Sequence, residues 1–482
     1  MMQTQTGQTI RWSRKTIILL DILLVVTPLL LLAGLEVYLR HTRYGLDERL
    51  FIPAGQNRHQ SSTSTYQLNQ QLYRKYYPTD DPMVKNLIPR IGMKQQKSDK
   101  DFRVFCLGGS TTGGPFPALL HELLNHSNVN SAVEVVNLGI ITFNSYQVLD
   151  IVKKLPQYDP DLLIIYMGHN EIYGPLGVGS KVALGTSRDV INLVLRLREF
   201  KVYQLANNLY SSLRASPVRS GKERSPYKMM VNSSLAPRHP LREQAIENFA
   251  GNLREILSIA DRHQIPVIVG TIVSNLRDWR PFDSEPPPDS LDGARWQQLQ
   301  ASGKAAFERN RLEEAERTYQ TAIELFPDHA QTHFDLGHVY LAMGHRDKAE
   351  RSFTTARDLD VLPIRAPSAV NETIRGIAEE ADVVLADFEA VFRDHDPESV
   401  MGKPVFFEHL HPTILGDYLI ASHLTNLILD EGFLVADNRL DFDDPSLKRD
   451  LGINLDRAGV ARLRQMLRLW PFNINNAGYQ FP

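Results

Sequence analysis

Short apolar runs alternate with helix-like stretches over most of the chain between residues 102 and 388. Five runs have the length and composition of buried strands, and their ranges are 102–109, 133–140, 161–168, 265–273 and 381–388. Amphipathic segments at 242–262 and 369–379 precede the last two runs. Strands that alternate with helices predict a parallel sheet covered by helices on both faces, which is the α/β class.

A long interruption separates the fourth and fifth predicted strands. Residues 296–360 contain no strand-like run and are rich in Ala, Glu, Arg and Leu. The interruption repeats with a period of 34 residues, which pairs Gly303 with Gly337, Ala315 with Ala349, Tyr319 with Phe353 and Ala322 with Ala356. Together with Pro327, these small and aromatic residues resemble the tetratricopeptide (TPR) repeat.

Two such repeats are fewer than the three or so that an isolated solenoid needs. We therefore expect them to pack against the α/β domain or against flanking helices. Two roles remain open for them: bracing of that domain and binding of a protein partner.

An apolar stretch at residues 16–35 contains Asp21 as its only charge and follows three basic residues, Arg11, Arg14 and Lys15. At a rise of about 1.5 Å per residue, a helix of this length crosses a hydrocarbon core of about 30 Å. The preceding basic residues keep the N-terminus in the cytoplasm. We predict a retained signal anchor, with a cleaved signal peptide and a buried core helix as alternatives.

These patterns divide the chain into segments with different expected roles. The predicted segments are a cytoplasmic tail (1–15), a transmembrane anchor (16–35), a juxtamembrane segment (36–100), the first part of the α/β domain (101–290), the helical insertion (291–362), the second part of the α/β domain (363–430) and a C-terminal helical extension (431–482). Residues 41–100 are polar and irregular, which is typical of a stalk or of a segment that leans on the main domain. Within the extension, residues 457–470 have the pattern of an amphipathic helix.

Composition excludes several classes of function. The chain of 482 residues has 53 basic and 56 acidic side chains and therefore lacks the excess of positive charge that is typical of a nucleic-acid binder. The single cysteine, Cys106, cannot form an intramolecular disulfide. His409 and His411 have no matching carboxylate or cysteine pairs at ligand spacing, so we expect neither a metal nor a cofactor. Residues 108–114 lack the lysine of a phosphate-binding loop.

Three of the predicted strands end in residues that could support acyl chemistry. Ser110 follows Gly108 and Gly109, and a helix predicted to start near 115–118 would turn backbone N–H groups toward a developing oxyanion. Gly139 ends the second strand, and Asn170 follows the third. In isolation these residues are equally typical of a helix cap or a turn. They nevertheless share the carboxyl edge of the sheet, where open α/β sheets bind their ligands.

A possible base lies far downstream, in the sequence FFEHLHPT at 406–413. His411 could take the proton of Ser110 while Glu408, three residues earlier, orients the other ring nitrogen. His409 is a second histidine in the same segment, and one of the two could be structural only.

The order and spacing of these segments resemble the SGNH/GDSL hydrolases, and the repeats, GHNEIYG (168–174) and SNLRDW (274–279) resemble a branch of that family with a TPR insertion. The resemblance covers roughly residues 100–425 and implies a flavodoxin-like three-layer fold. It also implies Ser110 as the nucleophile, Gly139 and Asn170 as oxyanion donors beside the Ser110 backbone, and His411 as the base. Gly109 and Glu408 depart from the family pattern, which has Asp at both positions. The hydrogen bonds of the first Asp must then come from other groups, and the longer Glu408 makes a Ser–His dyad an alternative to a triad.

The resemblance implies a serine esterase that forms an acyl-Ser110 intermediate. Its expected substrate is an ester, such as an O-acetyl group on an envelope glycan, because the predicted anchor places the domain outside the cytoplasm, in the periplasm of a Gram-negative cell. Acyl transfer to a sugar hydroxyl is one alternative. A catalytically silent scaffold that recruits an envelope protein through its repeats is another.

Overall fold

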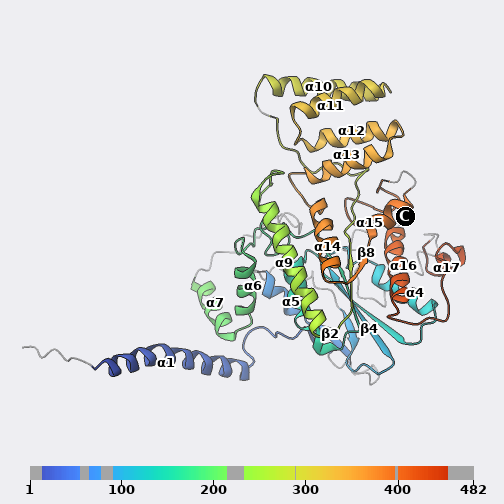
Figure 1. The fold of residues 1–482 in the computed structure, drawn as a ribbon. Helices are drawn as coiled ribbons and strands as arrows, with labels where there is room; N and C mark the ends of the chain where they lie inside the picture. Colours follow the sequence, from blue (N-terminus) through green and yellow to red (C-terminus); the bar gives the residue numbers. More distant parts are fainter. Residues whose placement is uncertain are drawn as a thin grey trace, which may run out of the picture. The chain divides into compact units, whose positions relative to one another are not determined.

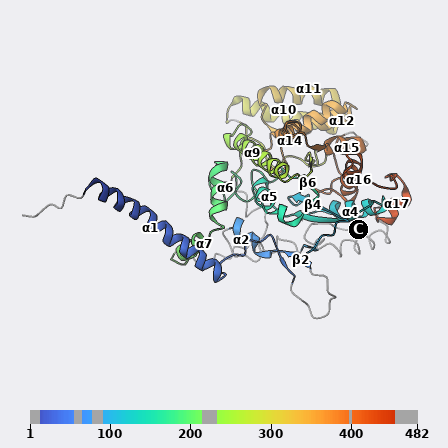
Figure 2. The same cartoon turned by 60° about the horizontal axis from the view of Figure 1, so that its bottom comes forward.

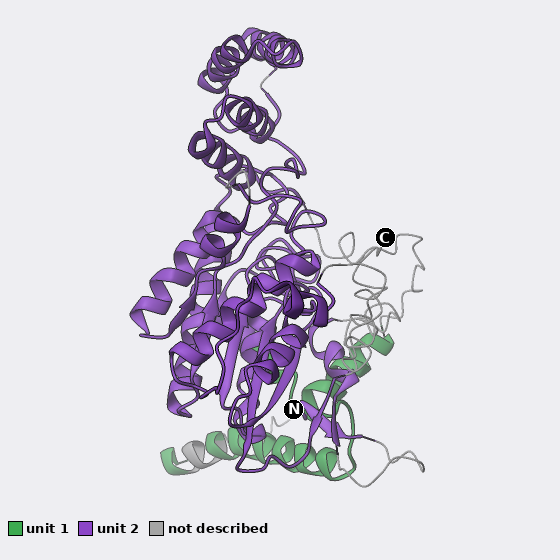
Figure 3. Cartoon of the chain, turned by 90° about the vertical axis from the view of Figure 1, so that its right-hand side faces the viewer, with its two compact units in different colours: residues 1–48, 193–220 green, residues 49–192, 221–482 purple. Residues whose placement is uncertain are grey.

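The computed structural model describes residues 13–54, 65–77, 91–213, 233–287, 289–396 and 400–453. The chain forms two compact units, coloured separately in Figure 3. The smaller unit contains residues 1–48 and 193–220, and the larger unit contains residues 49–192 and 221–482.

A five-stranded parallel sheet forms the centre of the larger unit (Figure 1). Its strands are β4 (Asp101–Gly108), β5 (Ala132–Gly139), β6 (Leu162–Tyr166), β7 (Val267–Gly270) and β8 (Val384–Ala386). Their order across the sheet is β5-β4-β6-β7-β8, the flavodoxin-like order of a doubly wound fold. The predicted α/β class and all five predicted strands are confirmed, although β7 and β8 are shorter than predicted.

Helices cover both faces of this sheet because its strands carry apolar side chains on both sides; every residue of β6 is buried. On one face α5 (Ser145–Val152) and α14 (Ser368–Glu380) pack against α9 (Pro240–Arg262). On the other face α16 (Ile414–Asp430) packs against α4 (Phe116–His126) and α15 (Phe388–His395). The sheet is therefore the middle of three layers.

Residues 41–100, predicted to be irregular, contain a second, antiparallel sheet, so the prediction of irregular structure was wrong for their described part. The strands are β1 (Phe51–Pro53), β2 (Thr65–Leu68) and β3 (Gly92–Lys94). The short helices η1 (Gln70–Leu72) and α2 (Tyr73–Tyr76) come between β2 and β3 in the chain; β2 and α2 are labelled in Figure 2. Strands of three or four residues are too short to give a clear alternation in sequence. Lys75 and Tyr76 both bond the carboxylate of Asp150 on α5, which attaches this segment to the main sheet's helices.

Four helices stand between β7 and α14: α10 (Leu291–Glu308), α11 (Leu312–Leu325), α12 (Ala330–Ala342) and α13 (Arg346–Asp358). The 34-residue pairing has a packing reason. A Cβ on Gly303 would lie 2.9 Å from the Tyr319 ring, and a Cβ on Gly337 would lie 2.7 Å from the Phe353 ring. Glycine at these positions lets the two helices of each hairpin approach closely, and the predicted pair of helical hairpins is confirmed.

One carboxylate joins the two ends of this insertion. Asp360 accepts hydrogen bonds from the backbone N–H groups of Phe282, before the insertion, and of Leu362, after it, at 2.7 and 3.0 Å. Asp360 also pairs with Arg365 at 3.6 Å, and both side chains are only 2% exposed. The insertion is thereby fixed to the α/β domain by a buried ion pair.

The smaller unit is built on α1 (Arg14–His41), which includes Pro28. Within α1, the span Asp21–His41 contains an 18-residue stretch with a mean hydropathy of 2.3, and the span is long and apolar enough to cross a membrane. The same unit contains the end of α6 (Arg188–Leu197) and all of α7 (Lys201–Leu213). The remaining elements belong to the larger unit and are η2 (Leu155–Tyr158) and α17 (Pro445–Asp450). The amphipathic helix predicted at 457–470 lies outside the described residues.

Candidate active site

Ser110 lies in the turn directly after β4, at the carboxyl edge of the sheet. Its Oγ is 2.8 Å from Nε2 of His411, a residue 301 positions away in the sequence. The helix-cap alternative does not apply, because α4 begins at Phe116 after Pro115 and has no side-chain cap. Thr112 donates instead to the carbonyl of Tyr166 at 2.6 Å, which ties the turn to the end of β6.

Glu408 completes a chain of hydrogen bonds that begins at Ser110. Its Oε1 lies 2.7 Å from Nδ1 of His411 and also accepts the backbone N–H groups of Leu410 and His411. Burial alone would raise the pKa of Glu408, but hydrogen bonds from His409 and His411 outweigh burial and hold this pKa well below its usual range. The extra methylene of Glu relative to Asp therefore does not prevent the contact with Nδ1.

His409 and His411 occupy different surroundings, which separates their roles. His409 bonds the second carboxylate oxygen of Glu408 through Nδ1, and its ring packs against the rings of Trp279 and Phe282. Burial lowers the pKa of His409. His411 is the histidine that contacts Ser110, while the ring of Phe407 stacks on it at a centroid distance of 5.9 Å. His409 thus holds Glu408 in place from the side opposite His411.

Asn275 and Arg365 fix the segment that carries these histidines. Asn275 donates its backbone N–H to the carbonyl of His409 at 3.0 Å and its amide to the carbonyl of Glu408 at 3.2 Å. Arg365 donates in turn to the carbonyls of Asn275 and Trp279, both at 2.8 Å. Asn275 lies in the SNLRDW segment, but sequence alone gave it no role because its partners are backbone atoms of a distant loop.

Asn170 reaches the same edge of the sheet from the end of β6. Its Nδ2 donates to the carbonyl of Phe143 at 2.9 Å, which uses one of its two amide hydrogens and joins two loops rather than capping a helix. Gly109 packs against both groups, since a Cβ there would lie 2.8 Å from Asn170 Nδ2 and 3.1 Å from the Phe143 carbonyl oxygen. Glycine in place of the family's Asp is therefore matched to the close approach of Asn170.

Gly139 does not fit its predicted part as an oxyanion donor. Its N–H donates to Oδ1 of Asn137 at 2.8 Å, and a Cβ at this position would lie 2.0 Å from the backbone nitrogen of Gly113. The reason is the sheet register: β5 stays paired with β4 as far as Gly139 opposite Gly108. The chain leaves the sheet only at the following residues, so Gly139 supports the turn after Ser110 instead of facing a substrate.

Glu171, next to Asn170, is buried and anchors this loop from behind. It accepts from the backbone N–H and the hydroxyl of Ser145, at 3.0 and 2.6 Å. Burial raises the pKa of Glu171 to about 7. On the other side of Asn170, His169 joins the carbonyl of Val273 to the N–H of Ala366, and burial lowers its pKa to about 3. Asn170 is thus held between two buried polar residues.

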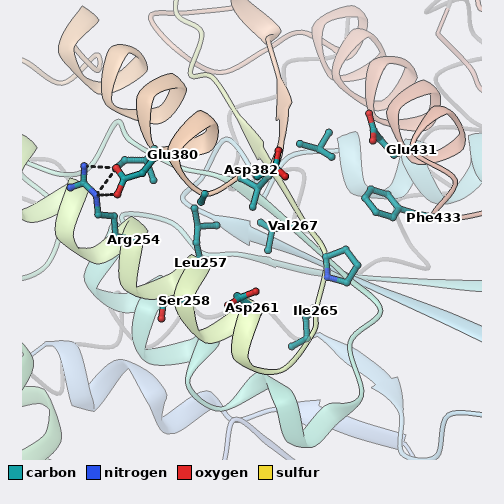
Figure 4. A pocket seen from close by; sticks show the side chains of 15 residues that line it. Arg254, Leu257, Ser258, Asp261, Ile265, Val267, Glu380, Asp382, Glu431 and Phe433 are labelled. Atoms are coloured by element: carbon teal, nitrogen blue, oxygen red, sulfur yellow. Dashed lines mark hydrogen bonds and ion pairs between the residues drawn. The ribbon is translucent and has the colours of Figure 1, made fainter.

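A pocket of about 620 Å³ lies away from these residues (Figure 4). Its lining includes Val267 and Val384, the first residues of β7 and β8, and Arg254, which pairs with Glu380. Since the strands are parallel, this pocket is at the amino edge of the sheet, whereas Ser110 is at the carboxyl edge. Among the described residues, no group of three or more His, Cys, Asp or Glu side chains is arranged to hold a metal ion.

Comparison with solved structures finds similar but distant proteins. A GDSL-like lipase from Bacteroides thetaiotaomicron is 12% identical, with a TM-score of 0.31, over 70% of this chain and 92% of its own. An acetyl xylan esterase is 11% identical, with a TM-score of 0.31, over 68% of this chain and all of its own. Comparison with curated proteins finds no match.

Family models add information for the insertion only. A TPR repeat model matches residues 303–344, and a second tetratricopeptide repeat model matches residues 330–360. These ranges cover most of α10 to α13, where the 34-residue period and the close glycine–aromatic contacts occur. Residues 303–360 therefore form tetratricopeptide repeats.

Proposed function

We propose that this chain is a membrane-anchored serine hydrolase that cleaves an ester through an acyl-Ser110 intermediate. One observation carries the proposal: Ser110 Oγ lies 2.8 Å from His411 Nε2, and His411 Nδ1 lies 2.7 Å from Glu408. A hydroxyl, an imidazole and a carboxylate connected in this order form the arrangement that activates a serine for nucleophilic attack.

The reaction has two halves that use His411 in the same way. Ser110 Oγ attacks the ester carbonyl carbon while its proton passes to Nε2 of His411. The tetrahedral intermediate then expels the alcohol, which takes that proton, and leaves the acyl group on Ser110. Water next gives a proton to Nε2 and bonds the acyl carbon, after which the acid departs and Ser110 regains its proton. Glu408 stays ionised throughout and stabilises the imidazolium that forms in each half.

Two donors are available to the negative oxygen of the intermediate. They are the backbone N–H of Ser110 and the second amide hydrogen of Asn170, whose first hydrogen is held by the Phe143 carbonyl. Loss of one such donor typically costs about 3–4 kcal/mol of transition-state stabilisation. Gly139 has no place among these donors, because its N–H is bonded to Asn137.

We further propose that α1 is a retained anchor and that the hydrolase acts outside the cytoplasm on an ester, with O-acetylated envelope carbohydrate as the substrate class. The apolar, exposed span at Asp21–His41 and the basic residues before it support this orientation. N-terminal sequencing of the mature protein tests the anchor. A chain that begins beyond residue 35 would show a cleaved signal peptide instead.

Labelling of the full chain with a fluorophosphonate probe tests the nucleophile. We expect wild type and Ser212→Ala to be labelled, because Ser212 is an exposed serine on α7. Ser110→Ala should not be labelled, and His411→Ala should react several orders of magnitude more slowly. The hydrolase proposal would be wrong if folded wild type stayed unlabelled, or if Ser110→Ala were labelled equally. A silent scaffold would then be the better interpretation.

Product analysis separates hydrolysis from acyl transfer, because the two reactions share the acyl enzyme. Free acid from an activated acetyl ester, in the presence of an excess of a soluble sugar, supports hydrolysis. Acylated sugar as the main product would replace hydrolysis with transfer.

A further inference from the structure

Large apolar side chains are exposed on α7 and on the end of α6, within the smaller unit. Leu213 is 87% exposed, which is the highest value among these residues. The exposed apolar residues of this region are Leu193, Leu197, Phe200, Leu209, Tyr210 and Leu213. So many large exposed apolar side chains on two successive helical segments are unusual for a surface that faces water.

The apolar residues of α7 lie on one side of the helix. At about 100° per residue, Val202, Leu205, Leu209 and Leu213 form one stripe, and Ser211 lies opposite it. The polar side packs against the segment after α1: Oε1 of Gln204 accepts the Leu46 N–H at 2.9 Å, and Asn208 donates to the Tyr44 hydroxyl at 3.0 Å. The apolar stripe therefore faces away from that segment.

The N-terminal end of α7 is fixed to α1 at one depth. Glu36 accepts the backbone N–H of Val202 at 2.9 Å, and Arg40 donates to the carbonyl of Glu199 at 3.3 Å. Glu36 and Arg40 also pair with each other at 2.7 Å. Both residues lie in the last turns of the candidate span Asp21–His41, so α7 begins near the level where α1 would leave the hydrocarbon core.

We propose that α7 and the end of α6 form an interfacial helix pair that lies on the phospholipid surface, with Leu209 and Leu213 inserted among the acyl chains. This inference rests on the proposal that α1 spans the membrane. If α7 instead ran into the bilayer beside α1, the side chains of Asn207, Asn208 and Ser211 would enter hydrocarbon, which is unfavourable.

If α7 lies in the plane of the interface, its apolar side and its polar side each face a favourable environment. The apolar stripe enters the acyl region while the polar residues stay with water and headgroups. Tyr210, at the border between the two sides, has the mixed character of side chains that concentrate at membrane interfaces. Lipid is favoured over a protein partner because the stripe starts at Val202, whose backbone N–H bonds Glu36 on the helix proposed to span the membrane.

The chain contains one cysteine, and because it is buried, a site-specific test is possible in the full chain. Cys106 is fully buried, and burial raises the pKa of its thiol, so an introduced surface cysteine can be labelled selectively. The variants are Leu209→Cys and Leu213→Cys on the apolar stripe, Ser211→Cys on the polar side as the matched control, and Leu31→Cys in α1 as the membrane reference. Each carries an environment-sensitive dye in vesicles of phosphatidylethanolamine and phosphatidylglycerol.

We expect brominated acyl chains to quench the dyes at 31, 209 and 213 several-fold more than the dye at 211, and aqueous iodide to show the reverse order. The interfacial proposal is wrong if iodide quenches the dyes at 209 and 213 as strongly as the dye at 211 while the dye at 31 is quenched by lipid. It is also wrong if 209 and 213 are shielded from both quenchers, since a protein would then cover the stripe. If the dye at 31 is exposed to iodide, the anchor itself fails, and the inference fails with it.

Discussion

Glu408 is held between two histidines, with one carboxylate oxygen on Nδ1 of His411 and the other on Nδ1 of His409. Only His411 also reaches Ser110. The carboxylate is therefore fixed by one histidine while it orients the other, an arrangement that supports the proposed triad in spite of the longer Glu side chain.

Glu408→Gln should lower kcat for an activated ester by roughly 10³–10⁴-fold, because a neutral amide cannot stabilise the imidazolium form of His411. Glu380→Gln, at an exposed ion pair with Arg254, is the matched control and should leave kcat unchanged. Steady-state kinetics of both variants measure the effect. A fall of less than tenfold in Glu408→Gln would indicate a Ser–His dyad.

Gly109→Ala should reduce activity by displacing Asn170, since the new Cβ would lie 2.8 Å from its amide nitrogen. We expect kcat to fall by about 10²–10³-fold, the usual cost of losing one oxyanion donor. Gly376→Ala in α14 is the control, because a Cβ there meets nothing within 4 Å. The control should leave kcat unchanged and raise the free energy of unfolding by up to about 1 kcal/mol. Normal kcat in Gly109→Ala would contradict the proposed donor role of Asn170.

Glu171→Gln should alter how stability depends on pH. Burial raises the pKa of Glu171 from 4.5 to about 7, so the folded state binds the proton more tightly than the unfolded state. Its contribution to stability is fully present below pH 4.5 and is lost as the pH rises through 7. Between pH 4.5 and pH 7 the free energy of unfolding of the wild type should fall by about 3 kcal/mol relative to that of Glu171→Gln. Urea unfolding of both proteins at several pH values tests this, and parallel stability profiles would refute it.

Asp360→Asn should destabilise the protein by about 3–5 kcal/mol, because it leaves the buried guanidinium of Arg365 without its charge partner. Breaking the exposed pair of Arg254 and Glu380 with Arg254→Gln should cost less than about 1 kcal/mol. Chemical unfolding monitored by circular dichroism compares the two. Since Arg365 also holds Asn275, kcat should fall in Asp360→Asn even where the protein remains folded. Equal stabilities of the two variants would show that the pair does not fix the insertion.

The sequence by itself determined those elements in which buried residues recur at a regular spacing along the chain. Alternating apolar runs predicted the parallel sheet, and the 34-residue spacing of Gly303 and Gly337 predicted the repeat hairpins, because each pattern records packing between chain neighbours. The motifs around Ser110 and His411 also predicted that these two side chains lie together at the carboxyl edge of the sheet. Strands as short as β1 to β3 left no such pattern and were missed.

Only the tertiary structure decided which atoms of these loops meet. It separated His411 from His409, removed Gly139 from the oxyanion donors by showing its N–H on Asn137, and assigned Asn275 and Arg365 to the support of the histidine loop. The physical reason is that these hydrogen bonds join backbone and side-chain groups far apart in the sequence. Their geometry depends on where each strand leaves the sheet, which no local pattern of hydrophobic and polar residues records.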